Sequence, residues 1–351
     1  MQYLKSLFLK SFVKEQIDFI NPNLIRRILV LKYDKIGDMV ITSPFFRELK
    51  KNLPSVEITV LASKVNYPII CRNPHINKIY IYENQWQKLL PTLFKLRKQK
   101  YDLCFEFEAG FVTRAFLLTK IINPKYVVSV FKQHGRYNLS AEHLKVYDFY
   151  TNFSPESHRS LNILDTLSVF GMVKKNNKYE LFPDKKSIQF TSDFLKNFSV
   201  SSKKIGINLQ GITFTGGISN QKLIDIIQGL NNMFDDLIFF ILASPWEENK
   251  VERMLSQINI SNVFGTYFDI DEVITFINQL NLVISVDTSI VHIACALDTP
   301  LVAIYAKDKT NYQQWHPVSK KFEVVFSKSL SDISNFKAGS VIEYSAKLLN
   351  S

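Results

Sequence analysis

A buried strand that ends at a polar corner and opens a helix constrains this chain more than any other feature. Residues 282–286 read Leu-Val-Ile-Ser-Val, a continuous apolar run typical of a strand covered on both faces of a parallel sheet. Good helix N-caps form the corner: Asp287, Thr288 and Ser289. Small or apolar residues follow to Leu297, residues 298–300 (Asp-Thr-Pro) stop the helix, and residues 301–305 form a second apolar strand. We therefore expect a βαβ unit.

The start of this predicted helix suits a phosphate. Its unpaired backbone N–H groups and its positive dipole end both attract an anion. Thr288 and His292 lie four residues apart, so they share one face of the first turns. Two interpretations stay open: the corner binds an anion, or residues 287–289 only cap the helix and His292 is a structural histidine.

Residues 287–300, Asp-Thr-Ser-Ile-Val-His-Ile-Ala-Cys-Ala-Leu-Asp-Thr-Pro, resemble the nucleotide-sugar phosphate motif of glycosyltransferase family 9, the bacterial heptosyltransferases of lipopolysaccharide core synthesis. The family motif is usually Asp, Ser or Thr, Gly, two variable residues, His, and an Ala-rich helix that ends before Pro. Ser289 stands where the family usually has Gly, and its backbone N–H still suits a phosphate. The resemblance implies that the following residues bind the donor: Asp287, Thr288, Ser289 and His292.

A second segment resembles the opening motif of the same family. Residues 35–54 follow a predicted strand, 27–32, and begin Lys-Ile-Gly-Asp. In the family the Gly-Asp pair closes the first loop, and the Asp is the proposed general base. The resemblance therefore implies Asp38 as the catalytic residue, with Lys35 and Gly37 on the acceptor side.

The loop before Asp38 also excludes other nucleotide-binding folds. It has one glycine where the dinucleotide fingerprint Gly-x-Gly-x-x-Gly needs three, and no Walker phosphate loop is present. A helix is expected to run to about Leu53, and it begins either near Asp38 or at Ser43, with Pro44 as its first helical residue.

Positive charge is concentrated in the N-terminal half. The formal net charge is +11, and residues 1–160 carry 25 Lys and Arg against 13 Asp and Glu, whereas residues 161–351 carry 18 against 19. Such a field attracts a nucleic acid, an acidic membrane or a phosphorylated glycolipid, unless the lysines near residues 95–100 are only a solvated helix face. Since no basic-aromatic motif of nucleic-acid-binding modules is present, we expect an anionic glycolipid and no nucleic acid.

Cysteine usage and hydropathy predict a cytoplasmic protein without a metal. Three cysteines lie far apart, without the paired spacing of a metal site: Cys71, Cys104 and Cys295. No apolar run is long enough to cross a bilayer. Residues 1–20 mix aromatic and aliphatic residues with lysines, which fits either an interfacial helix on the inner membrane or a helix packed on the protein body.

Strand and helix patterns alternate along both halves, which predicts an α/β fold of two Rossmann-like domains. The expected strands are residues 57–62, 76–82, 101–107, 126–131, 204–209, 237–243 and 263–266, and the expected helices are 86–99, 111–122, 160–171, 221–233, 246–258 and 270–280. The resemblance implies that the two domains face each other as in the GT-B architecture. The predicted domains are a basic acceptor-binding domain (1–175), a linker (176–186), a nucleotide-sugar-binding domain (187–337) and a C-terminal helix (338–351) that crosses back to the first domain.

Two cationic side chains are predicted for the acceptor side. Lys64 and Arg114 follow strands at the sheet edge where Asp38 lies, and they either reach an anionic acceptor or remain solvated. The irregular segment 133–157 is interpreted as an acceptor-side loop.

The donor side departs from the family in the loop 210–219. Family members usually place Lys or Arg ahead of a Trp-Pro pair here, whereas this chain has Gly216-Gly217. We expect backbone amides and three side chains to bind the donor instead: Gln210, Thr213 and Thr215. Glu247 or Glu248 falls where the family has an acidic residue near the donor ribose or sugar, although both also suit a solvated helix N-terminus.

Together these expectations describe an inverting, metal-independent glycosyltransferase that moves a heptose-like sugar from an ADP-linked donor to a lipopolysaccharide or lipooligosaccharide core acceptor. No cofactor is expected beyond the nucleotide sugar itself. The alternatives are another nucleotide-sugar donor, a binding homologue with weak catalysis, and, less favoured, a nucleic-acid-binding protein.

Overall fold

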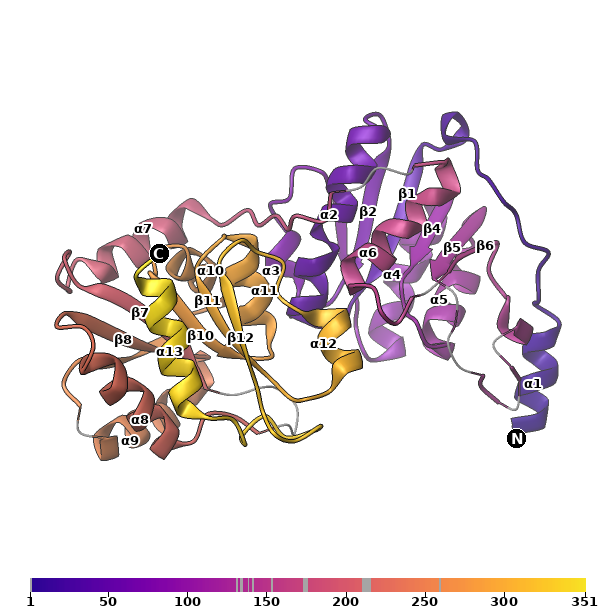
Figure 1. Ribbon diagram of the computed structural model, residues 1–351. Helices are drawn as coiled ribbons and strands as arrows, with labels where there is room; N and C mark the ends of the chain where they lie inside the picture. Colours follow the sequence, from indigo (N-terminus) through magenta and orange to yellow (C-terminus); the bar gives the residue numbers. More distant parts are fainter. Residues whose placement is uncertain are drawn as a thin grey trace. The chain divides into compact units, whose positions relative to one another are not determined.

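The computed structural model describes residues 2–130, 132, 135–137, 139–140, 142–152, 154–172, 176–209, 216–258 and 260–351, with side chains from Lys5 onward. The chain forms two units, Met1–Asn177 and Lys178–Ser351. Each described unit contains one six-stranded sheet whose paired strands are all parallel, as expected for Rossmann-like domains (Figure 1).

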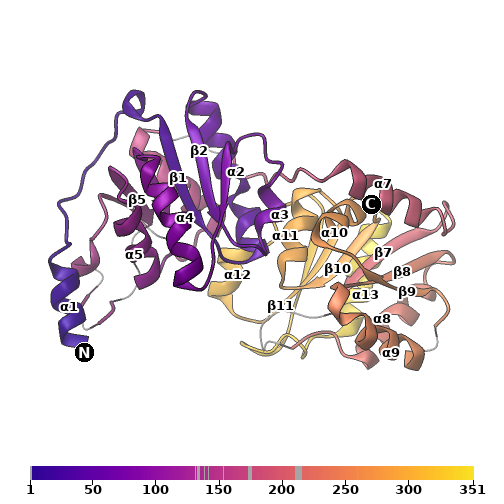
Figure 2. The same ribbon diagram turned by 180° about the vertical axis from the view of Figure 1, so that it is seen from behind.

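The first unit has the strand order β3-β2-β1-β4-β5-β6. Its strands are β1 (Arg27–Lys32), β2 (Glu57–Ala62), β3 (Lys78–Ile81), β4 (Leu103–Glu106), β5 (Tyr126–Val130) and β6 (Phe149–Thr151). Its helices are α1 (Gln2–Lys10), α2 (Ile36–Asn52), α3 (Tyr67–Ile70), α4 (Trp86–Lys98), α5 (Thr113–Ile122) and α6 (Arg159–Asp165), with short 3₁₀ turns at Pro22–Leu24, Glu142–Leu144 and Thr166–Phe170. Helices α2 and α6 cover one face of the sheet (Figure 1), and α4 and α5 cover the other (Figure 2).

The second unit repeats this plan with the order β12-β11-β10-β7-β8-β9. Its strands are β7 (Lys203–Asn208), β8 (Leu237–Ala243), β9 (Val263–Tyr267), β10 (Leu282–Val286), β11 (Leu301–Tyr305) and β12 (Phe322–Phe326). Its helices are α7 (Lys185–Leu195), α8 (Asn220–Asn231), α9 (Glu248–Ile258), α10 (Ile270–Ile277), α11 (Ser289–Ala296), α12 (Lys309–Trp315) and α13 (Ala338–Leu349), and a 3₁₀ turn spans Pro245–Glu247. Helices α8 and α13 pack together over one face, and α7 packs with α10 over the other.

The central strands are continuous apolar runs, which explains why they lie in the interior of their sheets. All five residues of β10 are buried, and so are all five of β11. In β1 every residue after Arg27 is buried, including Lys32, whose side chain is 2% exposed. A lysine at such a position requires anionic partners, and these belong to the site described below.

Helix α2 begins near Asp38, the first of the two predicted starts, and not at Ser43. Lys35 has extended backbone angles (φ −86°, ψ 170°) and is the N-cap, so Asp38 falls in the first turn. Pro44 lies inside the helix and cannot donate to the carbonyl of Val40. The Ser43 hydroxyl donates to that carbonyl instead, at 2.7 Å, so Ser43 repairs the helix and does not start it.

An extended segment links α1 to β1 and runs along the outer side of the sheet. Ile17 N–H donates to Asp148 O (3.0 Å), while Asp148 N–H donates to Val127 O in β5 (3.0 Å). Two further backbone bonds hold the segment: Lys14 N–H to Lys145 O (2.9 Å) and Ile20 N–H to Val169 O (2.8 Å). The segment therefore lies alongside the chain that leads into the edge strand β6.

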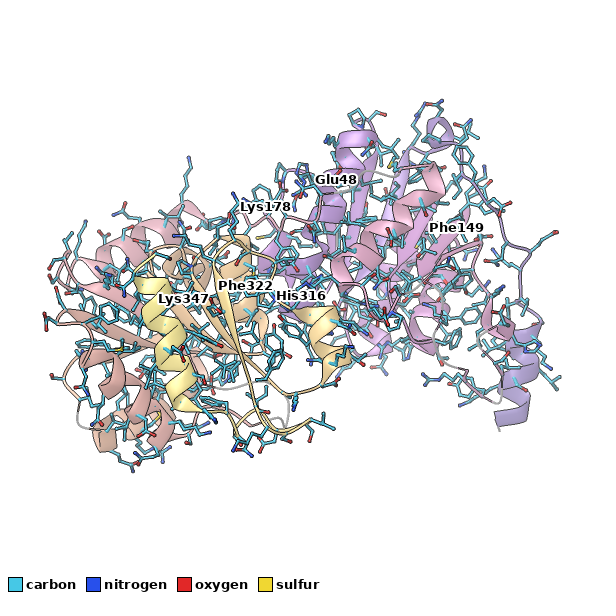
Figure 3. All side chains as sticks on the ribbon, in the orientation of Figure 1. Glu48, Phe149, Lys178, His316, Phe322 and Lys347 are labelled. Atoms are coloured by element: carbon cyan, nitrogen blue, oxygen red, sulfur yellow. The ribbon has the colours of Figure 1, made fainter. Side chains whose placement is uncertain are left out.

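The last helix, α13, is part of the second unit and packs against α8 and β10–β12. Gly229 of α8 permits a close approach, since a Cβ there would lie 2.4 Å from Ile342 Cδ1. Lys347 of α13 pairs with Glu323 of β12 at 2.5 Å (Figure 3). The apolar face of the helix is thus used within its own unit.

The domain boundary lies between Asn177 and Lys178, whereas the predicted linker spanned 176–186. Five α-helices and strands of the described chain had no counterpart among the predicted ones: α3, β6, α7, α12 and β12. Strand β6 falls inside the segment interpreted as an irregular loop, and its three residues are too few to show a period.

Candidate active site

Each sheet has a point where the strand order reverses. In the first unit β1 and β4 are neighbours, and in the second unit β7 and β10 are neighbours. The connections leave such neighbours toward opposite faces, which opens a crevice at their carboxyl ends where α/β folds bind ligands. Asp38 follows β1 and Thr288 follows β10, so both predicted motifs fall at these points.

At the crevice of the first unit, three charged side chains form what we call the Lys32 cluster: Lys32, Asp34 and Asp38. Lys32 Nζ hydrogen-bonds to Asp34 Oδ2 and lies 3.5 Å from Asp38 Oδ1. The Asp38 side chain is 21% exposed, so it is open to solvent on one side. Asp38 is therefore a carboxylate held against a cation and accessible to a ligand.

Burial and the opposite charge of a neighbour shift the pKa values of this cluster in opposite directions. The pKa of Asp34 is raised to about 6: burial is the largest cause, Lys32 opposes it, and the nearby carboxylates of Asp38 and Glu108 add to it. Burial lowers the pKa of Lys32, but the three carboxylates together hold it above its usual value. Lys32 is thus a permanent cation beside a carboxyl group whose pKa is raised.

The loop that carries Asp34 is fixed by its backbone. The amide of Asn66 donates to Asp34 O and to Lys32 O, each at 3.2 Å, and the Ser63 hydroxyl donates to Asp34 O at 3.1 Å. Both residues follow β2 at the same sheet edge. The Lys32 cluster is therefore positioned before any ligand arrives.

The predicted acceptor-side residues lie in different surroundings. Lys35 is exposed at the start of α2, and Gly37 is buried in its first turn. Lys64 Nζ pairs with Glu83 Oε1 at 2.9 Å but stays 71% exposed. The structure thus leaves the ammonium of Lys64 within reach of solvent and of an anionic ligand.

Arg114 makes packing contacts and a hydrogen bond within the same unit. Its guanidinium lies 5.0 Å from the ring centroids of both Tyr82 and Trp86 and donates to Glu83 O at 3.3 Å. These contacts hold the segment that follows β3. They favour a packed arginine over the solvated or acceptor-binding alternatives.

At the crevice of the second unit, Asn208 joins the two central strands. Its amide donates to Thr288 Oγ1 (2.9 Å) and to Ser285 Oγ (3.1 Å). Thr288 Oγ1 also accepts Ile290 N–H at 3.3 Å and is the N-cap of α11. Ser285 Oγ donates its proton to Val286 O. In the 3.3 Å contact between the hydroxyls of Ser285 and Thr288, Thr288 is therefore the donor. The Thr288 side chain is therefore engaged in capping, and the backbone at Ser289 remains as the predicted anion-binding element.

Asp287 and His292 are placed by the neighbouring helix α12. Asn311 of α12 donates to Asp287 Oδ2 at 2.9 Å. His292 is only 3% exposed, and its ring packs against Trp315 and Tyr179 with centroids 6.0 and 6.2 Å away. This burial favours the structural interpretation of His292 over a ligand contact shared with Thr288.

Glu247 lines a pocket of about 470 Å³ at the carboxyl ends of β7 and β8. Its carboxylate also accepts Ser244 N–H at 3.3 Å and completes a capping box. Lys250 and Arg253 bring positive charge to the same pocket. The predicted donor residues Gln210, Thr213 and Thr215 lie outside the described residues, which resume at Gly216 beside the pocket.

Neither a metal centre nor a membrane span was found in the described chain. No group of three His, Cys, Asp or Glu side chains among the described residues is arranged to hold a metal ion. Likewise, no helix of the described ranges combines the length and the apolar character of a membrane crossing.

The family model for glycosyltransferase family 9 (heptosyltransferase) matches residues 95–344, which is most of the chain. This chain belongs to glycosyltransferase family 9. The match starts within α4, so it includes the Thr288 motif but not the segment around Asp38. The assignment of Asp38 therefore depends on its own motif and on its position after β1.

Known members agree with this assignment. The chain is 23% identical over 297 residues to lipopolysaccharide heptosyltransferase 3 of Escherichia coli, covering 81% of this chain and 84% of that protein. Its fold matches the family 9 glycosyltransferase from Veillonella parvula DSM 2008 (TM-score 0.79, 15% identity, 95% of this chain and 99% of that one). It also matches E. coli ADP-heptose lps heptosyltransferase II (TM-score 0.74, 17% identity, 92% and 98%). The predicted GT-B fold and the predicted glycosyltransferase are both confirmed.

Two residues of this glycosyltransferase site were missed by sequence reasoning. Asp34 stood in the predicted loop without a role, and Asn208 was only the last but one residue of the predicted strand 204–209. A signal existed for Asn208, because it is a polar residue inside an apolar strand, two residues before a Gly-rich loop. For Asp34 the signal was Lys32, because a lysine inside a buried strand requires an anionic partner nearby.

Proposed function

We propose that this glycosyltransferase moves a heptose-like sugar from an ADP-linked donor to a hydroxyl of a lipopolysaccharide or lipooligosaccharide core acceptor, with inversion and without a metal ion. The observation that carries the proposal is the pair of crevices. A solvent-accessible carboxylate follows β1. A helix N-terminus follows β10, and its N-cap Thr288 accepts a hydrogen bond from Asn208, which lines the pocket. The related E. coli proteins are named for lipopolysaccharide and for ADP-heptose, which supports this choice of acceptor and donor.

In the proposed reaction Asp38 is the general base. It accepts the proton of the acceptor hydroxyl while that oxygen bonds to the anomeric carbon of the donor sugar. The bond from this carbon to the diphosphate oxygen breaks, and the diphosphate keeps the electron pair. Since attack and departure occur on opposite faces of the carbon in one step, the anomeric configuration inverts.

The second unit binds the donor and stabilises the leaving diphosphate. The N–H groups and positive dipole end of α11 supply preorganised charge for an anion. The cations of Lys250 and Arg253 line the pocket and compensate for the Lys or Arg that the family usually carries in the loop 210–219. Glu247 in the same pocket is suited to accept hydrogen bonds from ribose hydroxyls.

Transfer by the purified protein tests this function. With ADP-heptose and a core acceptor, we expect a product heavier by one heptose, an inverted anomeric centre by NMR, and the same rate in excess EDTA. UDP- and GDP-linked sugars serve as controls and should react far more slowly. Faster transfer from one of those donors would assign a different nucleotide sugar, and donor binding without transfer or hydrolysis would leave a binding protein.

The acceptor is proposed to be reached at the cytoplasmic face of the inner membrane, with α1 in contact with lipid. Residues 1–14 contain no Asp or Glu and include three lysines. Leu9 of α1 is buried against the first unit, whereas Leu7 and Phe8 are 47% and 53% exposed. A helix with basic and exposed apolar residues fits the interface of an anionic bilayer.

The position of α1 is consistent with this role. Lys5 Nζ lies 5.0 Å from the ring centroid of Tyr137, and the Tyr137 hydroxyl hydrogen-bonds to Thr113 Oγ1 at 2.7 Å. Thr113 is the first residue of α5, which follows β4 and so starts at the carboxyl edge of the sheet. The N-terminal end of α1 is therefore at the sheet edge that also carries Asp38.

Vesicle binding tests the contact. We expect the double variant Leu7→Ser/Phe8→Ser to bind vesicles rich in phosphatidylglycerol at least about tenfold more weakly, because burying such side chains contributes on the order of 1–2 kcal/mol each. The matched control is Phe19→Ser/Leu24→Ser, which removes residues 57% and 63% exposed outside α1. Co-sedimentation at low and high salt is the measurement. Equal binding by both variants, or equal binding to neutral phosphatidylcholine, would refute the contact.

A further inference from the structure

The mechanism above does not use Asp34, although it is the most perturbed carboxylate near Asp38. Its Oδ2 is bound by Lys32, while its Oδ1 is buried and has no hydrogen-bond partner within the described part of the chain. The Asp34 side chain as a whole is 26% exposed, but an oxygen that is shielded from solvent and unpaired is costly to keep in a fold. The pairing with Lys32 accounts for Oδ2 and leaves Oδ1 unexplained.

Lys32 connects Asp34 with Asp38. Its ammonium contacts one carboxylate and lies 3.5 Å from the other, and its side chain is 2% exposed. The cation cannot leave the cluster for solvent, so its charge is shared between the two acids. Whatever changes one carboxylate therefore changes the field at the other.

We propose that Asp34 is a positioning residue that sets the strength of Asp38 as a base by competing for Lys32. This inference rests on the proposed function, in which Asp38 accepts the acceptor proton. A lone Lys32 against Asp38 would stabilise its carboxylate and make it reluctant to take that proton. Asp34 draws the ammonium toward itself, so that Lys32 lies farther from Asp38 than from Asp34.

The titratable groups of the cluster come from four elements of the first unit. Lys32 comes from β1, Asp34 and Tyr33 from the loop, Asp38 from α2, and Glu108 from the segment after β4. The segment after β2 contributes only the uncharged Ser63 and Asn66, which bind the backbone of Asp34. Lys32 is the one cation acting on Asp34 among these groups.

Two substitutions should therefore shift the pH–rate profile in opposite directions. In Asp34→Asn the undivided charge of Lys32 falls on Asp38, so the acid limb of kcat/KM moves to lower pH by about one unit and the plateau rate drops by up to about tenfold, because a weaker base accepts the proton more slowly. In Lys32→Met the two carboxylates face each other without a cation, so the acid limb moves to higher pH.

The experiment compares the pH–rate profiles of the unmodified enzyme, Asp34→Asn and Lys32→Met with that of Asp148→Asn. Asp148 also pairs with a lysine of the first unit, Lys14, at 2.7 Å, and its substitution changes the net charge by the same amount. We expect opposite shifts for the first two variants and none for the control. Shifts in the same direction, or no shift in Asp34→Asn, would overturn the inference, because a purely structural role lowers the rate without moving the limb.

A second readout separates this inference from the proposed function. Carbon-13 NMR of the aspartate carboxyl groups follows the titration of Asp38 in each variant, whether or not sugar is transferred. If the unmodified protein transfers no heptose but the Asp38 signal titrates at lower pH in Asp34→Asn and at higher pH in Lys32→Met, the proposed function fails and the coupling stands. An Asp38 titration equal in all three proteins overturns the coupling, even if transfer is observed.

Discussion

Replacing Asp38 with Asn is expected to lower turnover by about a thousandfold or more while donor affinity stays close to that of the unmodified enzyme. A positioned general base contributes on the order of 10²–10⁴-fold, and an amide of the same shape accepts no proton from the acceptor hydroxyl. Asp38 belongs to the first unit, whereas the donor pocket is lined by residues of the second. The loss should therefore appear in kcat and not in ADP binding.

The measurement is steady-state transfer at saturating donor and acceptor, with ADP affinity from calorimetry. Lys32 keeps Asp34 as its partner in this variant, so we expect the fold to persist, and a thermal melt verifies it. Asp18→Asn, at an exposed position of the same unit, is the control for a change of one charge. Near-normal turnover of the Asp38 variant would show that another group takes the proton.

Replacing Lys132 with Met is expected to destabilise the first unit by about 3–5 kcal/mol, because it leaves a buried carboxylate without its cation. Lys132 Nζ lies 2.5 Å from Glu106 Oε2 and 2.8 Å from Ser129 Oγ. The Lys132 and Glu106 side chains are 1% and 2% exposed. Burial lowers the pKa of Lys132, and Glu106 opposes that shift, so the pair depends on mutual contact.

Urea unfolding followed by circular dichroism measures this loss. The double variant Glu106→Leu/Lys132→Met removes both charges and should recover most of the stability. Lys14→Met is the comparator, since its pair with Asp148 is partly exposed and should be worth no more than about 1 kcal/mol. A loss below about 1 kcal/mol for Lys132→Met would mean that Glu106 finds another partner or a proton without cost.

The same pair explains how the crevice of the first unit keeps its shape. Glu106 Oε1 accepts Glu108 N–H at 2.8 Å, and Lys132 Nζ also donates to Glu108 O. The two ends of the segment 106–108 are thus held by the pair of Glu106 and Lys132. Because Glu108 acts on both Lys32 and Asp34, the buried pair also fixes part of the field around Asp38.

Much of the fold was predictable because the residues of the central strands themselves show the pattern of a buried strand. Strands β1, β2, β8, β10 and β11 begin and end at the predicted residues, since each is an apolar run with polar or turn residues at its ends. The sequence left two starts of α2 open, because the choice depends on a hydroxyl that replaces the amide missing from Pro44. Strand β12 was missed because its pattern, Phe-Glu-Val-Val-Phe, has neither strict alternation nor a continuous apolar run.

The candidate site was predictable only as far as chain position determines it. Asp38 and Thr288 were placed at the carboxyl ends of their strands because parallel sheets leave their loops there. The roles of Asp34 and Arg114 depend on neighbours far along the chain. Arg114, for example, lies between two rings about thirty residues away, Tyr82 and Trp86. Such through-space contacts leave no period or spacing in the sequence.

The extended segment between α1 and β1 has a consequence for self-association. An uncovered sheet margin offers free backbone groups on which the strand of another molecule can add. Here Lys14 and Ile17 occupy the carbonyls of Lys145 and Asp148 on the outer side of the first sheet. The N-terminal residues thus protect this side of the sheet from edge-to-edge aggregation. A shorter chain that began at Asn21 would lose this protection while keeping β1 intact.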